Sequence, residues 1–372
     1  MVTEEDLRHM RRAIALADRG GGFVHPNPLV GAVVVKEGRV IGEGWHERYG
    51  EAHAERNALA ACGEDPRGAT LHVTLEPCCH HGKTPPCTDA IIAAGIARVV
   101  VALEDPNPLV AGKGIERLRQ AGIAVETGVR ASEAREQNRV FLKYITTRRP
   151  WVTLKTAMTL DGKIATRAGD SRWITGEAAR EMVHEARSRH MAVVAGIGTV
   201  LADDPLLNAR LPGREARQPA RVIVDSRARL PLESRIVQTA RLYATLLMHA
   251  PDAPGERLEA LRAAGVVCRT CAGMDGRVDV TDLCRQLGEA GIDSLLLEGG
   301  SELNHSFLSA RQVDEVLAFI APKIVGGAGA KSPVGGAGVE RMRDALELVD
   351  VQVSRVGEDI LIKGKIDVHG NH

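Results

Sequence analysis

The chain has 372 residues and a formal net charge of zero at pH 7, because 48 Lys and Arg balance 48 Asp and Glu. This balance gives no long-range attraction for nucleic acid, and three Trp, three Tyr and four Phe are too few for a platform that stacks bases. The N-terminal sequence MVTEEDLRHM lacks the basic and apolar regions of a secretory signal, and no apolar run approaches the ~20 residues that span a bilayer. We therefore expect a two-domain cytoplasmic protein with reduced thiols and without a nucleic-acid or membrane partner.

The first 146 residues predict an α/β/α sandwich. A helix over 4–19 begins after Thr3, whose hydroxyl can cap it, and carries acidic residues in its first turn. A hairpin with a KEGR turn follows, since the apolar run 29–36 precedes VIGEGW. The remaining elements are expected as a helix over 52–62, a strand over 70–74, a helix over 87–94, a strand over 98–103, a helix over 111–121, a strand over 123–127 and a helix over 131–144.

A metal motif lies within these elements, with His-Ala-Glu at 53–55, Pro-Cys at 77–78 and a second cysteine at 87. His53, Cys78 and Cys87 offer three N and S donors, the number that leaves a fourth zinc position open. Glu55 is then free to carry protons. This set is typical of zinc deaminases, in which metal-activated water attacks an amino-bearing ring carbon while a glutamate moves protons. The first domain is therefore predicted to be a hydrolytic deaminase, with Cys87 held as thiolate by a helix start.

Other roles for the cysteines remain open. Cys79, His80 or His81 could close the site as a fourth ligand and make the zinc structural, although such a site gives no reason for Glu55. The CRTC sequence at 268–271 also has metal-like spacing, but it lacks a second ligand pair and lies in a strand-like segment. We expect these two cysteines, Cys268 and Cys271, to be free thiols.

The sequence TTRRP at 146–150 marks the domain boundary, because Arg-Arg-Pro ends a helix and begins a new strand. The second domain, 150–367, alternates strands and helices, which predicts a largely parallel sheet covered on both faces. Strands are expected near 151–157, 192–195, 220–224, 242–247 and 293–298, and helices near 177–190, 256–264, 281–290 and 301–310. Three final strands, over 314–321, 346–354 and 359–366, are expected to form an antiparallel edge.

The second domain lacks the usual dinucleotide and phosphate motifs. The GIG sequence at 196–198 is not followed by the last glycine of GxGxxG, and GGAGAKS at 326–332 has alanine where a P-loop requires glycine. The EGGS sequence at 298–301 instead lies between a strand and a helix. Glycines there allow close approach, and the free N–H groups of the helix start can hold a pyrophosphate.

These motifs resemble one enzyme family over nearly the whole chain, about residues 3–367. In the first domain the resemblance rests on HPNPLVG at 25–31, TLEPCCHHGKTPPC at 74–87 and DPNP at 105–108. In the second it rests on LKTAMTLDGKIA at 154–165, SRWITG at 171–176, GIGTVLADDP at 196–205, IVDS at 223–226 and LLEGGSELNHSF at 296–307. The eight residues between the cysteines, where the commonest deaminase motif has C-x-x-C, narrow the family further. The chain resembles the bifunctional deaminase/reductases of riboflavin biosynthesis.

The resemblance implies an α/β protein, with a cytidine-deaminase-like sandwich followed by a dihydrofolate-reductase-like domain and with Zn²⁺ and NADPH as cofactors. It implies a small pyrimidine ribotide substrate, 2,5-diamino-6-(5-phosphoribosylamino)pyrimidin-4-one. The ring amine is removed first, and NADPH then reduces the ribosyl group to ribityl. Deaminase positions that match the family's substrate contacts are Asn27 and Asn107 at the ring and His80, Lys83 and Thr84 near the ribose phosphate.

In the second domain the resemblance assigns the reductase contacts. Positions that match NADPH contacts are Ala157, Trp173, Gly196, Thr199, Asp203, Ser226, Arg227, Gly299, Gly300 and Ser301. Positions that match substrate contacts are Ser171, Arg187, Leu207, Arg210 and Glu298, with the arginines suited to the phosphate. Lys155 and Glu298 are candidates for the acid that helps to open the sugar ring, since both are expected at strand ends beside the cofactor.

Two other functions remain compatible with the sequence. One is a nucleoside or nucleotide deaminase fused to a reductase-like domain, which would release ammonia from cytidine or dCMP. The other is a non-catalytic, zinc-stabilised binding protein, which would hydrolyse no amine. A homo-oligomer is also compatible with the sequence, which does not indicate the number of subunits.

Overall fold

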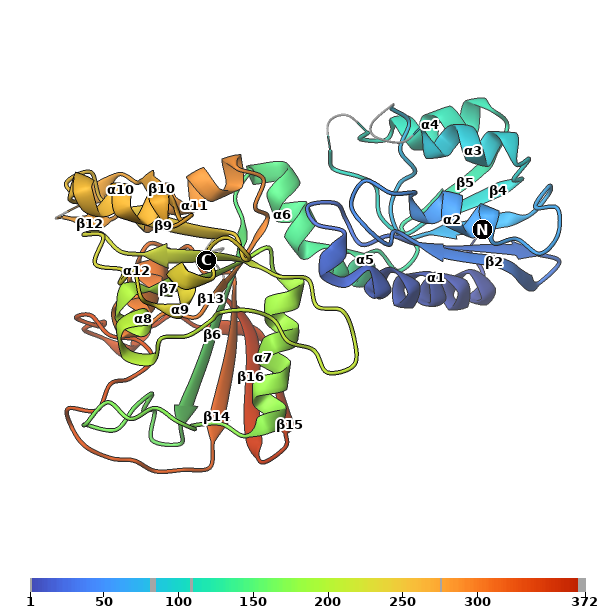
Figure 1. Ribbon diagram of the computed structural model, residues 1–372. Helices are drawn as coiled ribbons and strands as arrows, with labels where there is room; N and C mark the ends of the chain where they lie inside the picture. Colours follow the sequence, from blue (N-terminus) through green and yellow to red (C-terminus); the bar gives the residue numbers. More distant parts are fainter. Residues whose placement is uncertain (1, 81–84, 108–109, 275, 367–372) are drawn as a thin grey trace. The chain divides into compact units, whose positions relative to one another are not determined.

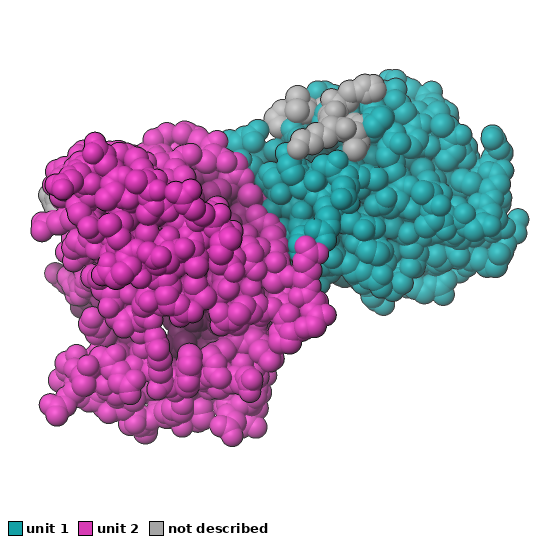
Figure 2. All heavy atoms as spheres, in the orientation of Figure 1, with its two compact units in different colours: residues 1–148 teal, residues 149–372 magenta. Residues whose placement is uncertain are grey.

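The computed structural model describes residues 2–80, 85–107, 110–274 and 276–366. The chain divides into two compact units, Met1–Arg148 and Arg149–His372, which Figure 2 shows in two colours. Within the described ranges, no helix is both long and apolar enough to cross a membrane. Lys83 and Thr84, two of the predicted substrate contacts, lie outside the described residues.

The first unit is a five-stranded sheet between two layers of helices, as expected (Figure 1). Its order is β2-β1-β3-β4-β5, with β1 antiparallel to both neighbours and the other pairs parallel. The strands are β1 (Gly31–Lys36), β2 (Arg39–Trp45), β3 (Thr70–Val73), β4 (Arg98–Val101) and β5 (Ala124–Thr127). The helices are α1 (Glu4–Ala17), η1 (Asp18–Phe23), α2 (Ala54–Ala60), α3 (Cys87–Ala93), α4 (Lys113–Gln120), α5 (Ala131–Gln137) and α6 (Arg139–Thr147).

Local sequence signals explain the start of this unit. Thr3 and Asp6 form a capping box, in which the Asp6 backbone N–H donates to the Thr3 hydroxyl at 3.2 Å and the Thr3 N–H donates to the Asp6 carboxylate at 2.8 Å. The β1–β2 turn uses Glu37 and Gly38, both with positive φ, which matches the twist of a two-residue hairpin. The predicted first helix and hairpin are confirmed.

The single helix predicted over 131–144 is wrong, because the chain breaks at Asn138 between α5 and α6. The Asn138 side chain is buried and bonds both backbone groups of Leu29, accepting from its N–H at 2.8 Å and donating to its carbonyl at 2.9 Å. A continuous helix pattern cannot reveal this tertiary contact, which ties the HPNPLVG segment to the end of the unit.

The second unit contains a nine-stranded sheet in the order β10-β9-β8-β7-β13-β6-β14-β16-β15. The seven strands from β10 to β14 are parallel, and β14-β16-β15 is the expected antiparallel edge (Figure 1). The strands are β6 (Trp151–Thr159), β7 (Ala192–Gly196), β8 (Ala220–Val224), β9 (Thr245–His249), β10 (Val267–Thr270), β13 (Ser294–Leu297), β14 (Glu315–Ala321), β15 (Leu348–Val356) and β16 (Asp359–Ile366). A small separate ribbon is formed by β11 (Gly273–Met274) and β12 (Arg277–Val278).

The helices of the second unit follow the parallel strands. They are α7 (Glu177–Arg189), α8 (Ile197–Asp203), α9 (Arg235–Gln238), α10 (Gly255–Ala263), α11 (Val280–Glu289), α12 (Ser301–Ser309) and η2 (Met342–Asp344). The four predicted helices are confirmed as α7, α10, α11 and α12. The sequence analysis did not predict α8 and α9, which have 7 and 4 residues.

Candidate active sites

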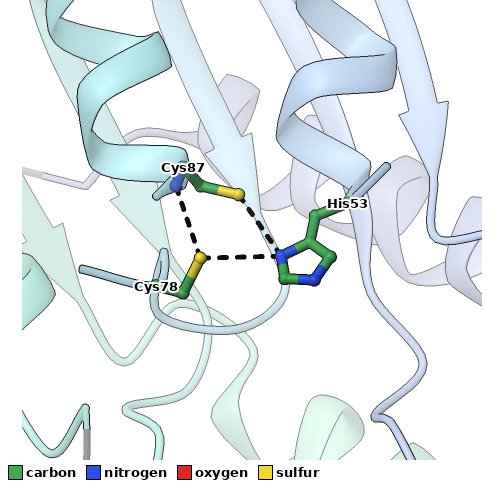
Figure 3. Close-up of side chains that lie close together, drawn as sticks. All are labelled: His53, Cys78 and Cys87. Atoms are coloured by element: carbon green, nitrogen blue, oxygen red, sulfur yellow. Dashed lines mark hydrogen bonds between the residues drawn. The ribbon is translucent and has the colours of Figure 1, made fainter. Parts of the chain in front are cut away.

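His53, Cys78 and Cys87 converge in the first unit from three segments (Figure 3). His53 is the N-cap residue of α2, Cys78 lies in the loop after β3, and Cys87 begins α3. The His53 Nδ1 atom lies 3.6 Å from the Cys78 sulfur and 3.4 Å from the Cys87 sulfur. The three donor atoms all lie within 4.8 Å of one another, so the structure brings the predicted ligands together.

These distances fit one tetrahedral ion. Zinc bonds of ~2.0 Å to nitrogen and ~2.3 Å to sulfur, at a tetrahedral angle, place the two donors about 3.5 Å apart. In the described part of the chain this group has no fourth His, Cys, Asp or Glu member, so neither Cys79 nor His80 closes it. Three ligands and an open position suit Zn²⁺ that binds water. Cys268 and Cys271 are free thiols, as predicted.

Glu55 follows the ligand His53 in the first turn of α2 and is 3% exposed. Burial raises the pKa of Glu55 to about 7, although His53 opposes the shift. A hydrogen bond with the Cys87 thiol, together with His53, lowers the pKa of Cys78 to about 4. The same contact and burial hold the pKa of Cys87 above its usual range. The Cys78 sulfur also accepts the Cys87 backbone N–H at 3.3 Å.

A cavity of about 360 Å³ adjoins this group and includes the predicted residues Asn27, His80 and Asn107 in its lining. His46 also lines it, and sequence reasoning missed this residue. His46 Nδ1 lies 3.1 Å from the Ala52 carbonyl, which can only accept, so Nε2 is the acceptor for the Asn27 amide nitrogen at 3.2 Å. The Asn27 amide is thereby oriented through its NH₂ group. The buried Nδ1 of His80 has no partner among the described residues, which leaves it available to a ligand.

Glu76 was also missed, although it lies in the TLEPC motif. Its buried carboxylate accepts four backbone N–H groups at 2.9–3.2 Å, from Asp105, Gly112, Gly114 and Ile115. Glu76 and Asp105 both line the cavity beside the metal group. Glu76 therefore holds the backbone of residues 105–115 in place. The sequence signal for this role is an acidic residue between a buried strand and a ligand cysteine.

A larger cavity, about 1000 Å³, lies in the second unit. Its lining includes most of the predicted reductase residues, namely Lys155, Ala157, Ser171, Trp173, Arg187, Thr199, Asp203, Leu207, Arg210, Glu298, Gly299 and Gly300. Ser226 and Ser301 are not part of the lining, and neither are Gly196 and Arg227. The Ser226 hydroxyl accepts the Val278 N–H at 3.1 Å, and the Ser301 hydroxyl donates to the Ser332 carbonyl.

Lys155 and Glu298 meet because their strands are neighbours. Leu154 of β6 pairs with Leu297 of β13 in parallel register, and the two charged residues follow them directly. Lys155 Nζ lies 3.6 Å from Glu298 Oε2, and burial lowers the pKa of Lys155. Burial acts to raise the pKa of Glu298, but Arg187 and Lys155 outweigh it and lower that pKa to about 2. Arg187, predicted for the phosphate, makes two hydrogen bonds to Glu298.

Gly299 and Gly300, two of the predicted cofactor contacts, directly precede α12 and line the cavity. A Cβ at Gly299 would lie 2.4 Å from Asn304 Oδ1, so a side chain at this position would require Asn304 to move. Gly300 is the N-cap of α12, whose free N–H groups suit a pyrophosphate. Asn304 Oδ1 is buried and has no partner among the described residues, and Asn304 lines the cavity. These features fit a dinucleotide such as NADPH.

Known proteins resemble both units. Residues 3–103 match the family model of the cytidine and deoxycytidylate deaminase zinc-binding region, and residues 150–362 match the RibD C-terminal domain. The riboflavin biosynthesis protein RibD of Actinobacillus pleuropneumoniae is 51% identical over 360 residues, which cover 97% of this chain and 95% of the relative. That of Escherichia coli is 42% identical over 369 residues, covering 96% and 98%.

Solved structures agree along the whole chain. Acinetobacter baumannii RibD has a TM-score of 0.88 at 39% identity and covers 98% of this chain and 99% of its own. The Thermotoga maritima diaminohydroxyphosphoribosylaminopyrimidine deaminase/5-amino-6-(5-phosphoribosylamino)uracil reductase has a TM-score of 0.84 at 42% identity, covering 97% and 99%. The fold class expected from the resemblance, a cytidine-deaminase-like domain followed by a reductase domain, is confirmed. The chain therefore belongs to the RibD family of riboflavin-biosynthesis enzymes, which join a zinc-dependent deaminase to an NADPH-dependent reductase.

Proposed function

We propose that residues 1–146 deaminate 2,5-diamino-6-(5-phosphoribosylamino)pyrimidin-4-one and that residues 150–367 reduce the ribosyl group of the product. The observation that carries the first step is the convergence of three zinc donors beside the buried carboxyl of Glu55. Membership of an enzyme family removes the alternative of a non-catalytic binding protein.

In the deaminase site His53, Cys78 and Cys87 are the proposed Zn²⁺ ligands, and Glu55 transfers protons as general base and general acid. When bound, Zn²⁺ lowers the pKa of a water molecule to about 7 and so supplies a nucleophile at neutral pH. A Glu55 carboxylate oxygen takes a proton and delivers it to the departing ammonia. The raised pKa of Glu55 suits both transfers, since the group can gain and lose a proton near pH 7.

The remaining deaminase residues position the substrate. Asn27 offers its carbonyl oxygen to a ring donor, because its NH₂ group is bonded to His46. Asn107 lines the same cavity and reads the ring from a second side. His80 binds near the ribose phosphate together with Lys83 and Thr84, which belong to the same sequence motif.

In the reductase site NADPH, when bound, supplies a hydride to the sugar C1′. Opening the sugar ring leaves an electron pair on the ring oxygen, which requires a proton. Lys155 Nζ is the proposed donor, and its lowered pKa favours release of the proton. Glu298 holds Lys155 in place, and Arg187 holds Glu298.

The proposed cofactor contacts are Ala157, Trp173, Thr199, Asp203, Ser226, Gly299, Gly300 and Ser301. The proposed substrate contacts are Ser171, Arg187, Leu207, Arg210 and Glu298. A cytoplasmic location fits the seven free cysteines, which a reducing compartment preserves. We also propose that the protein acts on this small molecule without nucleic acid or membrane, as its balanced charge suggests.

A coupled assay tests this function. The zinc-loaded protein is given the diaminopyrimidine ribotide, and ammonia release and NADPH oxidation are recorded separately. We expect ammonia without NADPH, and NADPH oxidation only after deamination. Ammonia from cytidine or dCMP, with none from the ribotide, would assign the first unit to nucleotide metabolism instead.

A further inference from the structure

His184 lines the reductase cavity but was not predicted from the sequence. It lies on α7, three residues before Arg187, so both side chains project from the same helix face. Both reach the carbonyl oxygen of Asn208, at 3.2 Å from His184 Nδ1 and 3.1 Å from Arg187 Nη1. Asn208 is buried and directly follows Leu207, whose φ is +51°.

The partners of His184 require one tautomer. A carbonyl oxygen only accepts, so Nδ1 must carry the proton. On the other side of the ring, Arg210 Nη2 lies 3.0 Å from Nε2, and a guanidinium only donates. Nε2 must therefore present its lone pair, and the ring must be neutral.

The surrounding charges keep the ring neutral. Burial, reinforced by Arg187 on the same helix and Arg210 on the facing segment, lowers the pKa of His184 to about 4. Glu298 is the carboxylate that acts in the opposite direction, and it is already paired with Arg187 and Lys155.

Arg210 is fixed without losing its charge. Its Nη1 donates to Asn208 Oδ1 at 2.9 Å, and its other recorded contact among the described residues is His184. Both partners are neutral. The neighbouring Ala209 is held at both backbone groups by Gln218, at 3.1 and 2.8 Å. Arg210 is exposed at the cavity, and among the described residues it is held by two neutral partners and forms no ion pair with a carboxylate.

We propose that His184 is a positioning residue for the reductase: as a neutral Nδ1–H tautomer it accepts from Arg210 and aims that guanidinium at the phosphate of the ribotide. A carboxylate could hold Arg210 equally well, but it would cancel the charge that attracts the phosphate. The inference rests on the proposed reductase function, in which Arg210 contacts this phosphate.

The test compares His184→Leu, His184→Gln, Arg210→Ala and the double variant His184→Leu/Arg210→Ala in the full chain. Each is assayed with NADPH on the deaminated ribotide and on the same compound without phosphate. For His184→Leu we expect a rise of about 10-fold in KM for the ribotide, the scale of one lost hydrogen bond to a charged group. We expect less than about twofold change in kcat, in KM for NADPH and in KM for the dephosphorylated compound. His184→Gln keeps an acceptor for Arg210 and should recover most of the loss.

The double variant should bind the ribotide as Arg210→Ala does, because His184 acts through Arg210. Ammonia release by the first unit serves as the internal control for folding. Equal KM increases for both compounds, additive effects in the double variant, or a fall in kcat alone would overturn the proposal.

A separate measurement does not depend on activity. In ¹⁵N-histidine-labelled protein, the resonance absent from His184→Gln should show a protonated Nδ1 and an unprotonated Nε2 at pH 7. The opposite tautomer, or a doubly protonated ring, would overturn the inference even if the reductase is active. An Nδ1–H ring in a protein that never oxidises NADPH with the ribotide would instead refute the proposed function.

Discussion

Arg187 and Glu298 form a two-pronged ion pair in the reductase cavity, with Nε to Oε1 at 2.6 Å and Nη2 to Oε2 at 2.9 Å. Their side chains are 15% and 10% exposed, so the pair is shielded from water. Lys155 contacts the same carboxylate from β6. Glu298 is therefore the centre of a small buried charge network.

Arg187→Met should destabilise the second unit. Removing one partner of a buried pair costs about 3–5 kcal/mol when the other charge is left uncompensated. The loss here should be smaller, because Lys155 still contacts the Glu298 carboxylate at 3.6 Å. Urea unfolding followed by tryptophan fluorescence measures the loss. Arg341→Met is the matched control, since Arg341 pairs with Asp344 on the surface of the same unit, where such pairs contribute ~0–1 kcal/mol. Equal losses in the two variants would contradict a buried network.

Lys155→Met should lower reductase turnover by ~10²–10⁴, the usual contribution of a general acid, with little change in KM for NADPH. Glu298 stays paired with Arg187 in this variant, so the fold should persist. Steady-state kinetics with the deaminated ribotide gives both constants. If turnover stays near the parental value and KM for NADPH rises, Lys155 is a cofactor contact and the acid lies elsewhere.

Glu55→Gln should abolish ammonia release while the protein keeps its zinc, because it removes the proton carrier but no ligand. Cys78→Ser should instead lose the metal. Zinc content by elemental analysis, measured beside ammonia release, separates the two outcomes. Cys62→Ser is the control, since Cys62 is not a member of the metal group. Parental deamination by Glu55→Gln would disprove the assigned role.

Glu76→Gln should destabilise the first unit by about 2–4 kcal/mol, because an amide cannot accept four N–H groups and its own NH₂ would face some of them. The KM of the deaminase should rise as well, since the bound segment contributes Asp105 to the cavity. Glu116→Gln changes an exposed carboxylate of α4 and should leave both quantities unchanged. Similar behaviour of the two variants would show that the Glu76 contacts contribute little.

Asp6 should make the stability of the first unit sensitive to acid. Its carboxylate binds Arg98 at 2.7 and 3.0 Å and His72 at 2.9 Å, and the Arg98 hydrogen bond, outweighing burial, holds its pKa far below the ordinary 3.8. The depressed pKa contributes stability that is present above pH 3.8 and is lost as pH falls toward the folded-state pKa. Parent and Asp6→Asn should therefore differ most in urea midpoint at pH 6–7 and least near pH 2. A difference that does not depend on pH would exclude this cause.

Much of the fold followed from local patterns. Apolar runs predicted strands of the first sheet, and the alternation of strand-like and helix-like segments predicted the parallel part of the second. The lack of helices after residue 312 predicted the antiparallel edge. The break at Asn138 did not follow, because it depends on the backbone of Leu29, more than a hundred residues away. Short helices such as α8 also escaped detection.

The sites show the same division. The metal group was predictable because zinc chemistry demands particular residue types, and these are rare enough to stand out. Residues that act by holding other residues were not predictable. Glu76, His46 and His184 are of this kind, and their spacing in the sequence does not distinguish them from ordinary polar residues. Arg187 was assigned to a phosphate, and a single sequence could not show that Glu298 binds its guanidinium.

The positions of His53 and Glu55 on α2 determine where an insertion or deletion is compatible with the zinc site. His53 caps the helix and Glu55 lies in its first turn, so one inserted residue between them would rotate the carboxyl by about 100° around the helix axis. The described residues between the two cysteines, 79–80 and 85–86, lie outside any helix or strand, and doubling the length of a loop costs only about 0.6 kcal/mol in closure entropy. Insertions should therefore accumulate between the cysteines during evolution, while the step from histidine to glutamate keeps its length.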